Sequence, residues 1–172
     1  HDCFNGLTAD PQKNVIVTTG AGEAIMLALL AMVNPGDEVI VQDPAWPNYQ
    51  GQILIAGGAR VSLPTYATDR FHVKAENLQK VITKRSKVLI INTPANPTGA
   101  VFTREELEDI ADVARQHDLL IISDEPYEKI IFDGREHVSI GSLPGMADRV
   151  ITVNSFSKTY AMTGWRVGYA HG

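Results

Sequence analysis

Two cations, Lys158 and Arg166, lie in surroundings that could support chemistry. Lys158 follows Ser155-Phe156-Ser157, so we expect its amine to be partly desolvated among hydroxyls and apolar side chains and able to act as a nucleophile. Arg166, in Thr163-Gly164-Trp165-Arg166, offers a planar fork of N–H donors that suits a phosphate dianion. Either residue taken alone is more typical of a solvated surface charge.

The next candidate is Asp124, a carboxylate that could bind a ring nitrogen. Asp124 comes directly after an apolar run, so we expect it to be partly buried, and a buried carboxylate is costly without a partner. A protonated ring nitrogen would be such a partner, whereas a helix N-cap is the ordinary alternative. Tyr127, three residues on, would lie on the same side if this segment is helical.

A phosphate site is suggested by Thr19-Gly20-Ala21-Gly22, which precedes an expected helix. Small residues let the N–H groups of Ala21 and Gly22 approach an anion, which a helix N-terminus also favours. The segment matches neither G-x-G-x-x-G nor a P-loop, which weakens nucleotide binding. A simple tight turn is the alternative.

Two further side chains could contact a flat ligand. Trp46 could stack on a ring, although a core position is the ordinary reading for a tryptophan. Asn96 lies between Pro94 and Pro97, which stiffen the loop and present its amide, with a cis bond before Pro97 as one option.

All these residues follow expected strands of one sheet. Apolar runs predict strands at 15–19, 38–42, 59–63, 87–91, 119–123, 150–154 and 165–170, with helices at 23–33, 46–56 and 75–82 and a capping box at Thr103 and Glu106 opening a helix to 117. This alternation indicates an α/β fold of one domain over residues 1–172, a three-layer α/β/α sandwich with a mostly parallel sheet. The join before the last strand is too short for a crossover, so that strand should be antiparallel.

In such a sheet, ligands bind beyond the carboxyl ends of the strands. The residues gathered there would supply a phosphate cradle, a stacking ring, an anion for a ring nitrogen and an amine nucleophile. Pyridoxal 5′-phosphate is the cofactor that needs all four.

The order of the motifs resembles the large domain of fold-type I, class I/II aminotransferases, the aspartate aminotransferase superfamily. The matching segments are Thr19-Gly20-Ala21-Gly22-Glu23-Ala24, Asn34-Pro35-Gly36-Asp37, Asn96-Pro97-Thr98-Gly99, Ser123-Asp124-Glu125-Pro126-Tyr127, Ser155-Phe156-Ser157-Lys158 and the run 163–169. Pro126 departs from the aliphatic residue usual in the family.

The resemblance implies a role for each site residue. Lys158 would form a Schiff base with the cofactor and shuttle a proton, Asp124 would pair with the ring nitrogen, and Tyr127 with Asn96 would bind the phenolic oxygen. Trp46 would stack on the ring. The phosphate would be held by the N–H groups of Ala21 and Gly22, the hydroxyls of Ser155 and Ser157, and Arg166.

The resemblance also implies transfer of an amino group between an amino acid and a 2-oxo acid in a homodimer. The family's N-terminal segment and C-terminal small domain are not visible in the sequence, so we expect a large-domain fragment with little activity of its own. Two alternatives stay open: a pyridoxal-phosphate lyase or synthase, and the aminotransferase-like sensor domain of a transcription regulator.

The composition of the chain argues against several other classes of protein. A formal charge of −5 argues against a nucleic-acid partner, and no apolar run reaches the length of a membrane span. The single cysteine, Cys3, excludes an internal disulfide, which agrees with the cytoplasm. The five histidines show no metal-ligand spacing, so no metal is expected.

Overall fold

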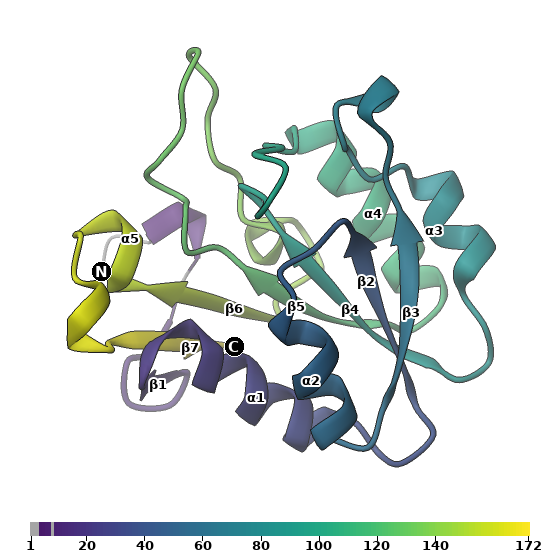
Figure 1. The fold of residues 1–172 in the computed structure, drawn as a ribbon, viewed down its shortest axis with the longest axis horizontal. Helices are drawn as coiled ribbons and strands as arrows, with labels where there is room; N and C mark the ends of the chain where they lie inside the picture. The colour runs from purple at the N-terminus through teal and green to yellow at the C-terminus, as the bar shows by residue number, and fades with distance from the viewer. Residues whose placement is uncertain (1–3, 8) are drawn as a thin grey trace.

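The computed structural model describes residues 4–7 and 9–172, and Cys3 lies outside them. A seven-stranded sheet runs through the molecule in the order β1-β7-β6-β5-β4-β2-β3 (Figure 1). Its strands are β1 (Val15–Thr18), β2 (Glu38–Asp43), β3 (Ala59–Pro64), β4 (Ser86–Asn92), β5 (Leu120–Asp124), β6 (Val150–Ser155) and β7 (Gly168–His171). Only β7 runs antiparallel to its neighbours, β1 and β6, which confirms the predicted topology.

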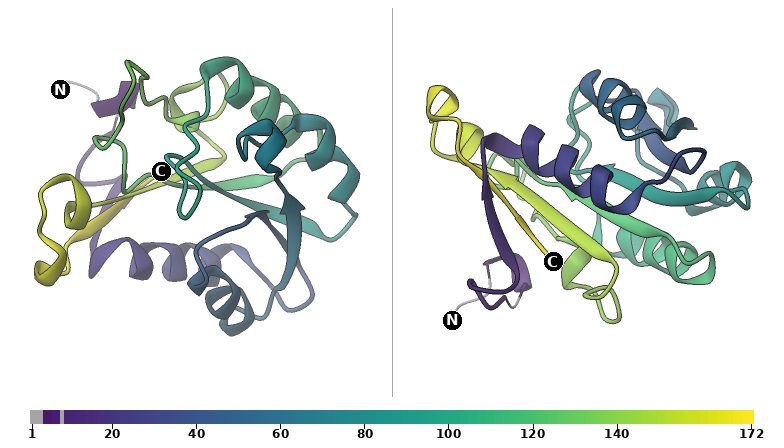
Figure 2. Two further views of the ribbon diagram at one scale, coloured as in Figure 1. Left: turned by 45° about the horizontal axis from the view of Figure 1, so that its top comes forward. Right: turned by 90° about the horizontal axis from the view of Figure 1, so that it is seen from below.

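Helices cover both faces of this sheet. The α-helices are α1 (Gly20–Met32), α2 (Asn48–Ile55), α3 (Ala75–Val81), α4 (Arg104–Gln116) and α5 (Phe156–Thr159), and short 3₁₀ turns span Phe4–Gly6, Ala67–Asp69, Ile140–Ser142 and Thr163–Trp165. The helices lie on the two sides of the sheet (Figure 2). One apolar core lies between the sheet and α1 with α2, and a second between the sheet and α3 with α4. The three-layer α/β/α architecture is therefore confirmed. Among the described residues, every helix is too short or too polar to cross a bilayer.

The two cores explain why the strands are apolar throughout. Along β2, Val39 and Val41 face the core under α1 and α2, whereas Ile40 faces the core under α3 and α4. Successive strand side chains point to opposite faces, so a sheet covered twice needs apolar residues at every position. Full burial of such a side chain contributes about 1.5–3 kcal/mol.

Three element boundaries differ by two residues or more from those predicted. Helix α1 begins at Gly20 rather than at residue 23, so the glycine segment is the helix's first turn and not a preceding loop. Helix α2 begins at Asn48 after Pro47, two residues later than expected. Strand β7 begins at Gly168, because the left-handed backbone of Arg166 (φ 52°) breaks the extended run.

Candidate functional site

One cavity of about 400 Å³ opens at the carboxyl ends of the strands. It is lined by all ten residues singled out in the sequence: Ala21, Gly22, Trp46, Asn96, Asp124, Tyr127, Ser155, Ser157, Lys158 and Arg166. Asn48, Gln52, Asn92, Pro126 and Thr163 complete the lining. Because these residues come from segments up to 145 positions apart, the parallel strands are what bring them together.

The most deeply buried charge of the cavity is Asp124 at the end of β5, which is 5% exposed. Its Oδ2 accepts a hydrogen bond of 2.5 Å from the Tyr49 hydroxyl, while its Oδ1 is buried with no hydrogen-bond partner among the described residues. Burial raises the pKa of Asp124 to about 7, against a lowering by Tyr49 and a further raising by Glu125. Asp124 is therefore a strand-end carboxylate with a free oxygen, and the helix N-cap alternative is wrong.

A row of side-chain amides holds the neighbouring strand ends. Asn92, at the end of β4, donates from Nδ2 to the Asp124 carbonyl at 2.8 Å and accepts at Oδ1 from the Asn96 amide N–H at 2.7 Å. Gln42 on β2 brackets the Asn92 backbone with two bonds of 2.9 and 3.1 Å. These bonds fix the start of the loop that carries Asn96, and its peptide bond before Pro97 is cis.

The opposite end of the cavity is rich in donors. Ala21 and Gly22 stand in the first turn of α1, where backbone N–H groups have no intrahelical acceptor. Arg166 donates to the Ser157 hydroxyl at 3.3 Å and to the Thr163 carbonyl at 3.0 Å. Ser155, buried at the end of β6, accepts from the Ser157 N–H at 3.1 Å.

The close approach of α1 to β7 makes this end of the cavity possible. A Cβ on Gly168 would lie 2.5 Å from the Gly20 carbonyl carbon and 2.7 Å from the Ala21 nitrogen, so only glycine fits there. Gly20 has a positive φ of 74°, and a Cβ there would collide with the Arg166 guanidinium. The first turn of α1 and the Arg166 side chain therefore share one small region.

Lys158 and Tyr127 meet across the mouth of the cavity. The Lys158 amine lies 5.6 Å from the centre of the Tyr127 ring. Lys158 is exposed, so the expectation of partial desolvation is not met within the described residues, although its neighbour Ser157 on the short helix α5 is buried. Trp46 is half-buried and meets Tyr49 edge to face at 5.4 Å.

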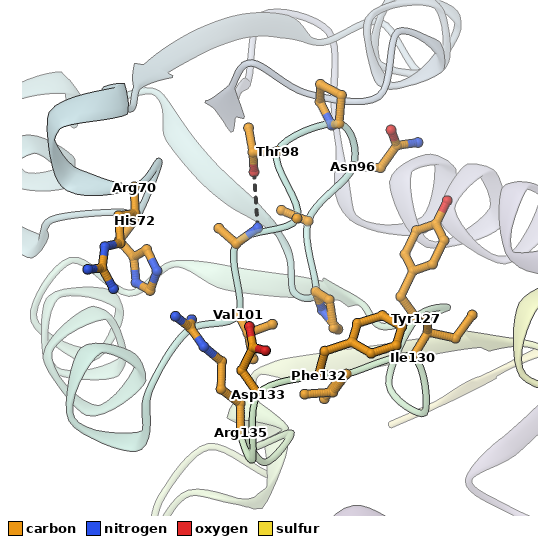
Figure 3. A pocket seen from close by; sticks show the side chains of 16 residues that line it. Arg70, His72, Asn96, Thr98, Val101, Tyr127, Ile130, Phe132, Asp133 and Arg135 are labelled. Atoms are coloured by element: carbon orange, nitrogen blue, oxygen red, sulfur yellow. Dashed lines mark hydrogen bonds between the residues drawn. The ribbon is translucent and has the colours of Figure 1, made fainter.

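Tyr127 also borders a second cavity of about 530 Å³ (Figure 3). Tyr127 and Asn96 line both cavities, and the other residues of this second wall include Ile130, Phe132 and Arg135. The segment at 126–129 forms turns rather than a helix, so the helical condition under which Tyr127 would share a side with Asp124 is not met. Its side chain nevertheless lines the same cavity as Asp124.

Sequence reasoning missed Tyr49 and Asn92, which hold Asp124 in place. Tyr49 lies inside the predicted helix 46–56, where a tyrosine is ordinary, and Asn92 is the last residue of an apolar strand. A polar residue ending a buried strand was the one available signal, and it applies to Asn92 as it does to Asp124. Nothing local distinguishes Tyr49, because its partner lies 75 positions away.

A sequence profile for the family described as aminotransferase class I and II matches residues 3–172. The aspartate aminotransferase of Pyrococcus abyssi is 48% identical over 165 residues, and the aromatic-amino-acid aminotransferase 2 of Thermococcus litoralis is 46% identical over 165 residues. Each match covers 96% of this chain and 42% of the relative.

Solved structures agree with these sequence matches. The crystal structure of an aromatic aminotransferase from Pyrococcus horikoshii superposes with a TM-score of 0.96 at 48% identity, covering 98% of this chain and 45% of that one. The aspartate aminotransferase of Thermus thermophilus with maleate gives 0.93 at 42% identity, covering 98% and 43%. The chain thus spans less than half the length of the relatives it matches. It belongs to the class I and II aminotransferase family.

Proposed function

We propose that the protein is a pyridoxal-phosphate-dependent aminotransferase and that residues 1–172 form its cofactor-binding large domain. Asp124 carries this proposal. It is a buried carboxylate with one oxygen satisfied by Tyr49 and the other without a partner, in a cavity that also holds an amine and a cluster of anion-binding donors. A ligand with a protonated ring nitrogen would satisfy the free oxygen.

The residues of the cavity fit this cofactor at each of its polar groups. The N–H groups of Ala21 and Gly22, the hydroxyls of Ser155 and Ser157 and the Arg166 guanidinium would hold the phosphate. Asn96 and Tyr127 would donate to the ring oxygen, Trp46 would stack on the ring and Lys158 would bind the aldehyde. When bound, pyridoxal phosphate supplies an electron-withdrawing ring that makes the substrate Cα–H acidic.

Asp124 would hold a proton on the ring nitrogen. The pKa of about 7 belongs to a carboxyl that is buried without a cation, and a cationic partner would favour its ionised form. Burial, followed by the charge of Asp124, raises the pKa of Tyr49 well above its usual range, so Tyr49 remains a donor to Oδ2. The bond from Tyr49 thus leaves Oδ1 for the ring nitrogen.

Lys158 would move the proton. An amine next to the reacting carbon can accept a proton in its neutral form and return it to another carbon, which is general acid–base catalysis worth about 10²–10⁴-fold. Its long, exposed side chain at the cavity mouth is free to swing between two atoms. The Tyr127 ring beside it limits where the amine can go.

Transfer of an amino group, rather than lyase or regulator chemistry, is supported by the names of the relatives. Relatives from Pyrococcus abyssi, Thermococcus litoralis and Musicola paradisiaca are named aspartate or aromatic-amino-acid aminotransferases. We therefore propose an amino acid and a 2-oxo acid as substrates, and do not favour either alternative.

We also propose a cytoplasmic homodimer. Three large apolar side chains are 58–74% exposed: Phe132, which lines the second cavity, and Tyr160 and Trp165, which are close in the chain to Lys158 and Arg166. Such exposure is typical of surfaces that a partner covers. One cysteine in 172 residues agrees with a reducing compartment.

Borohydride trapping tests the proposed function. The full-length protein should absorb in the visible after addition of pyridoxal phosphate, and reduction followed by mass spectrometry should place a pyridoxyl group on Lys158. Lys158→Ala should lose both signals. Lys84→Ala is the matched control, because Lys84 precedes the amino end of β4, away from the carboxyl ends of the strands where the cavity lies, and it should keep both. Labelling spread evenly over several lysines would contradict the proposal.

A further inference from the structure

A second buried carboxylate, Glu125, lies next to Asp124 but does not line the cavity. Its side chain is fully buried and satisfied by three donors: the Ser123 hydroxyl at 2.6 Å, the Ser139 hydroxyl at 2.7 Å and His137 Nε2 at 2.7 Å. His137 itself has a side chain only 5% exposed. Burying a carboxylate costs desolvation free energy, which its hydrogen bonds only partly offset. The cofactor contacts proposed above do not involve Glu125.

The Glu125 contacts close a loop. The chain leaves β5 at Glu125, passes through Tyr127, projects from the sheet as the green excursion in Figure 1, and returns at His137 and Ser139. Glu125 therefore joins the two ends of the segment 125–139. Tyr127, within it, is the only member of the segment besides Pro126 that lines the cofactor cavity.

Few of the side chains in the outer part of this loop are buried. All residues from 129 to 136 are exposed except Ile131, which is half-buried, and Phe132 is 73% exposed. Bonds near the base add to the Glu125 contacts: the Glu128 N–H donates to the Glu125 carbonyl at 3.3 Å, and the Ile130 N–H donates to the Tyr127 carbonyl at 2.8 Å. Since apolar packing is sparse, the polar base is what fixes the loop and the tyrosine it carries.

Several other ionisable groups lie near the Glu125–His137 contact at the base of the loop. Glu128 is 7% exposed, and burial raises its pKa, opposed by a hydrogen bond from Asn5 and supported by the charge of Glu125. Burial and then Glu128 raise the pKa of Tyr169 to about 12. Asp124 adjoins Glu125 in the chain, and Lys129 contributes a compensating charge to Glu128. His137 Nε2 lies within hydrogen-bond distance of the Glu125 carboxylate, at 2.7 Å.

We propose that Glu125 and His137 are positioning residues of the pyridoxal-phosphate site, whose contact closes the loop at its base and holds the Tyr127 hydroxyl in the cavity. The inference rests on the proposed function, because the Tyr127 hydroxyl has a role only if the cavity takes the cofactor. Neither Glu125 nor His137 lines the cofactor cavity. They act through Tyr127.

A double-mutant cycle in the full-length protein loaded with pyridoxal phosphate tests this inference. The readouts are the pH midpoint of the visible absorbance change of the bound cofactor and the melting temperature. Tyr127→Phe should shift the midpoint by about one pH unit, because a donor to the ring oxygen is lost. His137→Ala should shift it in the same direction by about half as much or more, and the double variant should shift it no further than Tyr127→Phe alone.

Two matched variants separate positioning from simple destabilisation. His137→Gln keeps a donor for Glu125, so its pH midpoint should lie close to that of the unaltered protein. His72→Ala removes another largely buried histidine paired with a glutamate, Glu106 at 2.7 Å, and should lower only the melting temperature. If His137→Ala does not fold, Ser139→Ala removes a single donor to Glu125 and should give a smaller shift in the same direction.

The outcomes are distinct. A lowered melting temperature with an unmoved midpoint in His137→Ala would make the pair merely structural and overturn the inference. Shifts of His137→Ala and Tyr127→Phe that add in full would mean that the pair acts by another route, which also overturns it. If the unaltered protein does not bind pyridoxal phosphate, the proposed function itself fails, and this result is visible before any variant is compared.

Discussion

At the scale of single residues, the site depends on a buried carboxylate, Asp124, that lowers the stability of the cofactor-free protein. Asp124 is buried beside Glu125 without a cation, so the cofactor-free protein carries an unfavourable charge there at neutral pH. The Tyr49 hydroxyl offsets part of this cost. Functional sites commonly hold such groups, because the feature that binds a ligand is the one that strains the empty protein.

Asp124→Asn should therefore stabilise the cofactor-free protein and disable the loaded one. A carboxyl whose pKa rises from 3.8 in the unfolded chain to about 7 when folded keeps more protons in the folded state. The free energy of unfolding of the unaltered protein consequently falls as the pH rises from about 4 to about 7 and is low above that range. The variant should be more stable by roughly 2–4 kcal/mol at pH 8, and this advantage should shrink by more than half at pH 5.

Thermal unfolding at these two pH values measures the effect on stability. Transaminase turnover of the loaded protein should fall by about 100-fold or more, since an amide cannot hold the ring-nitrogen proton as an anion does. Asp118→Asn, at an almost fully exposed aspartate, is the control and should change neither quantity. A variant that is equally active, or no more stable at pH 8, would refute the role given to Asp124.

At the scale of elements, the positions of helix starts decide the geometry of the site. Helix α1 places its first turn against β7 because Gly168 has no side chain. Helix α4 starts with a capping box, in which the Thr103 hydroxyl accepts from the Glu106 N–H and the Glu106 carboxylate accepts from the Thr103 N–H. The first contact positions the anion-binding donors, and the second supports the opposite face of the sheet.

Gly168→Ala should damage both stability and cofactor binding. The new Cβ would lie 2.5–2.8 Å from backbone atoms of Gly20 and Ala21, which cannot move aside as a flexible side chain could. We expect a loss of about 2–3 kcal/mol in unfolding free energy and weaker pyridoxal-phosphate binding in an absorbance titration. Gly51→Ala is the matched control: nothing lies within 4 Å of its Cβ, and it should stabilise α2 by about 0.5–1 kcal/mol.

Thr103→Ala should destabilise the fold without touching the site. Loss of the cap leaves a helix N–H without its acceptor, which costs about 1 kcal/mol. Denaturant unfolding should show this loss, whereas the pyridoxal-phosphate affinity should stay constant. Thr103→Ser keeps the hydroxyl and should recover most of the stability. A large change in affinity would mean that α4 is coupled to the cavity.

At the scale of the whole molecule, the described part presents a complete donor set in an open cavity. Lys158 and Arg166 are exposed, and apolar side chains around them face solvent. The relatives that match this chain are more than twice its matched length. In residues 1–172 alone, water can therefore reach the exposed mouth of the cavity and compete with the ligand for its polar groups.

Residues 1–172 expressed alone should accordingly bind pyridoxal phosphate at least about tenfold more weakly than the full-length protein, a difference of about 1.4 kcal/mol. Transaminase activity should be close to background. Absorbance titrations of both proteins at equal ionic strength provide the measurement, with Arg166→Ala in each as a check that the phosphate end is used. Equal affinities would show that the described cavity already holds every important contact.

The sequence by itself, with its family resemblance, determined the α/β sandwich, the antiparallel last strand and ten of the fifteen residues that line the cavity. It could do so because buried strands leave continuous apolar runs, and because strand ends, glycines and prolines mark where a ligand meets the sheet. Those signals are local in the chain.

Only the tertiary structure decided which polar groups are satisfied and which are free. The bond from Tyr49 to Asp124 spans 75 positions, the contacts of Glu125 close a loop, and Gly168 is required by a helix that lies about 150 residues earlier. Burial, exposure of Lys158 and the left-handed backbone of Arg166 likewise depend on packing between distant segments. A pattern in the chain specifies what each residue can offer, but its partner in space depends on the folded arrangement of the sheet.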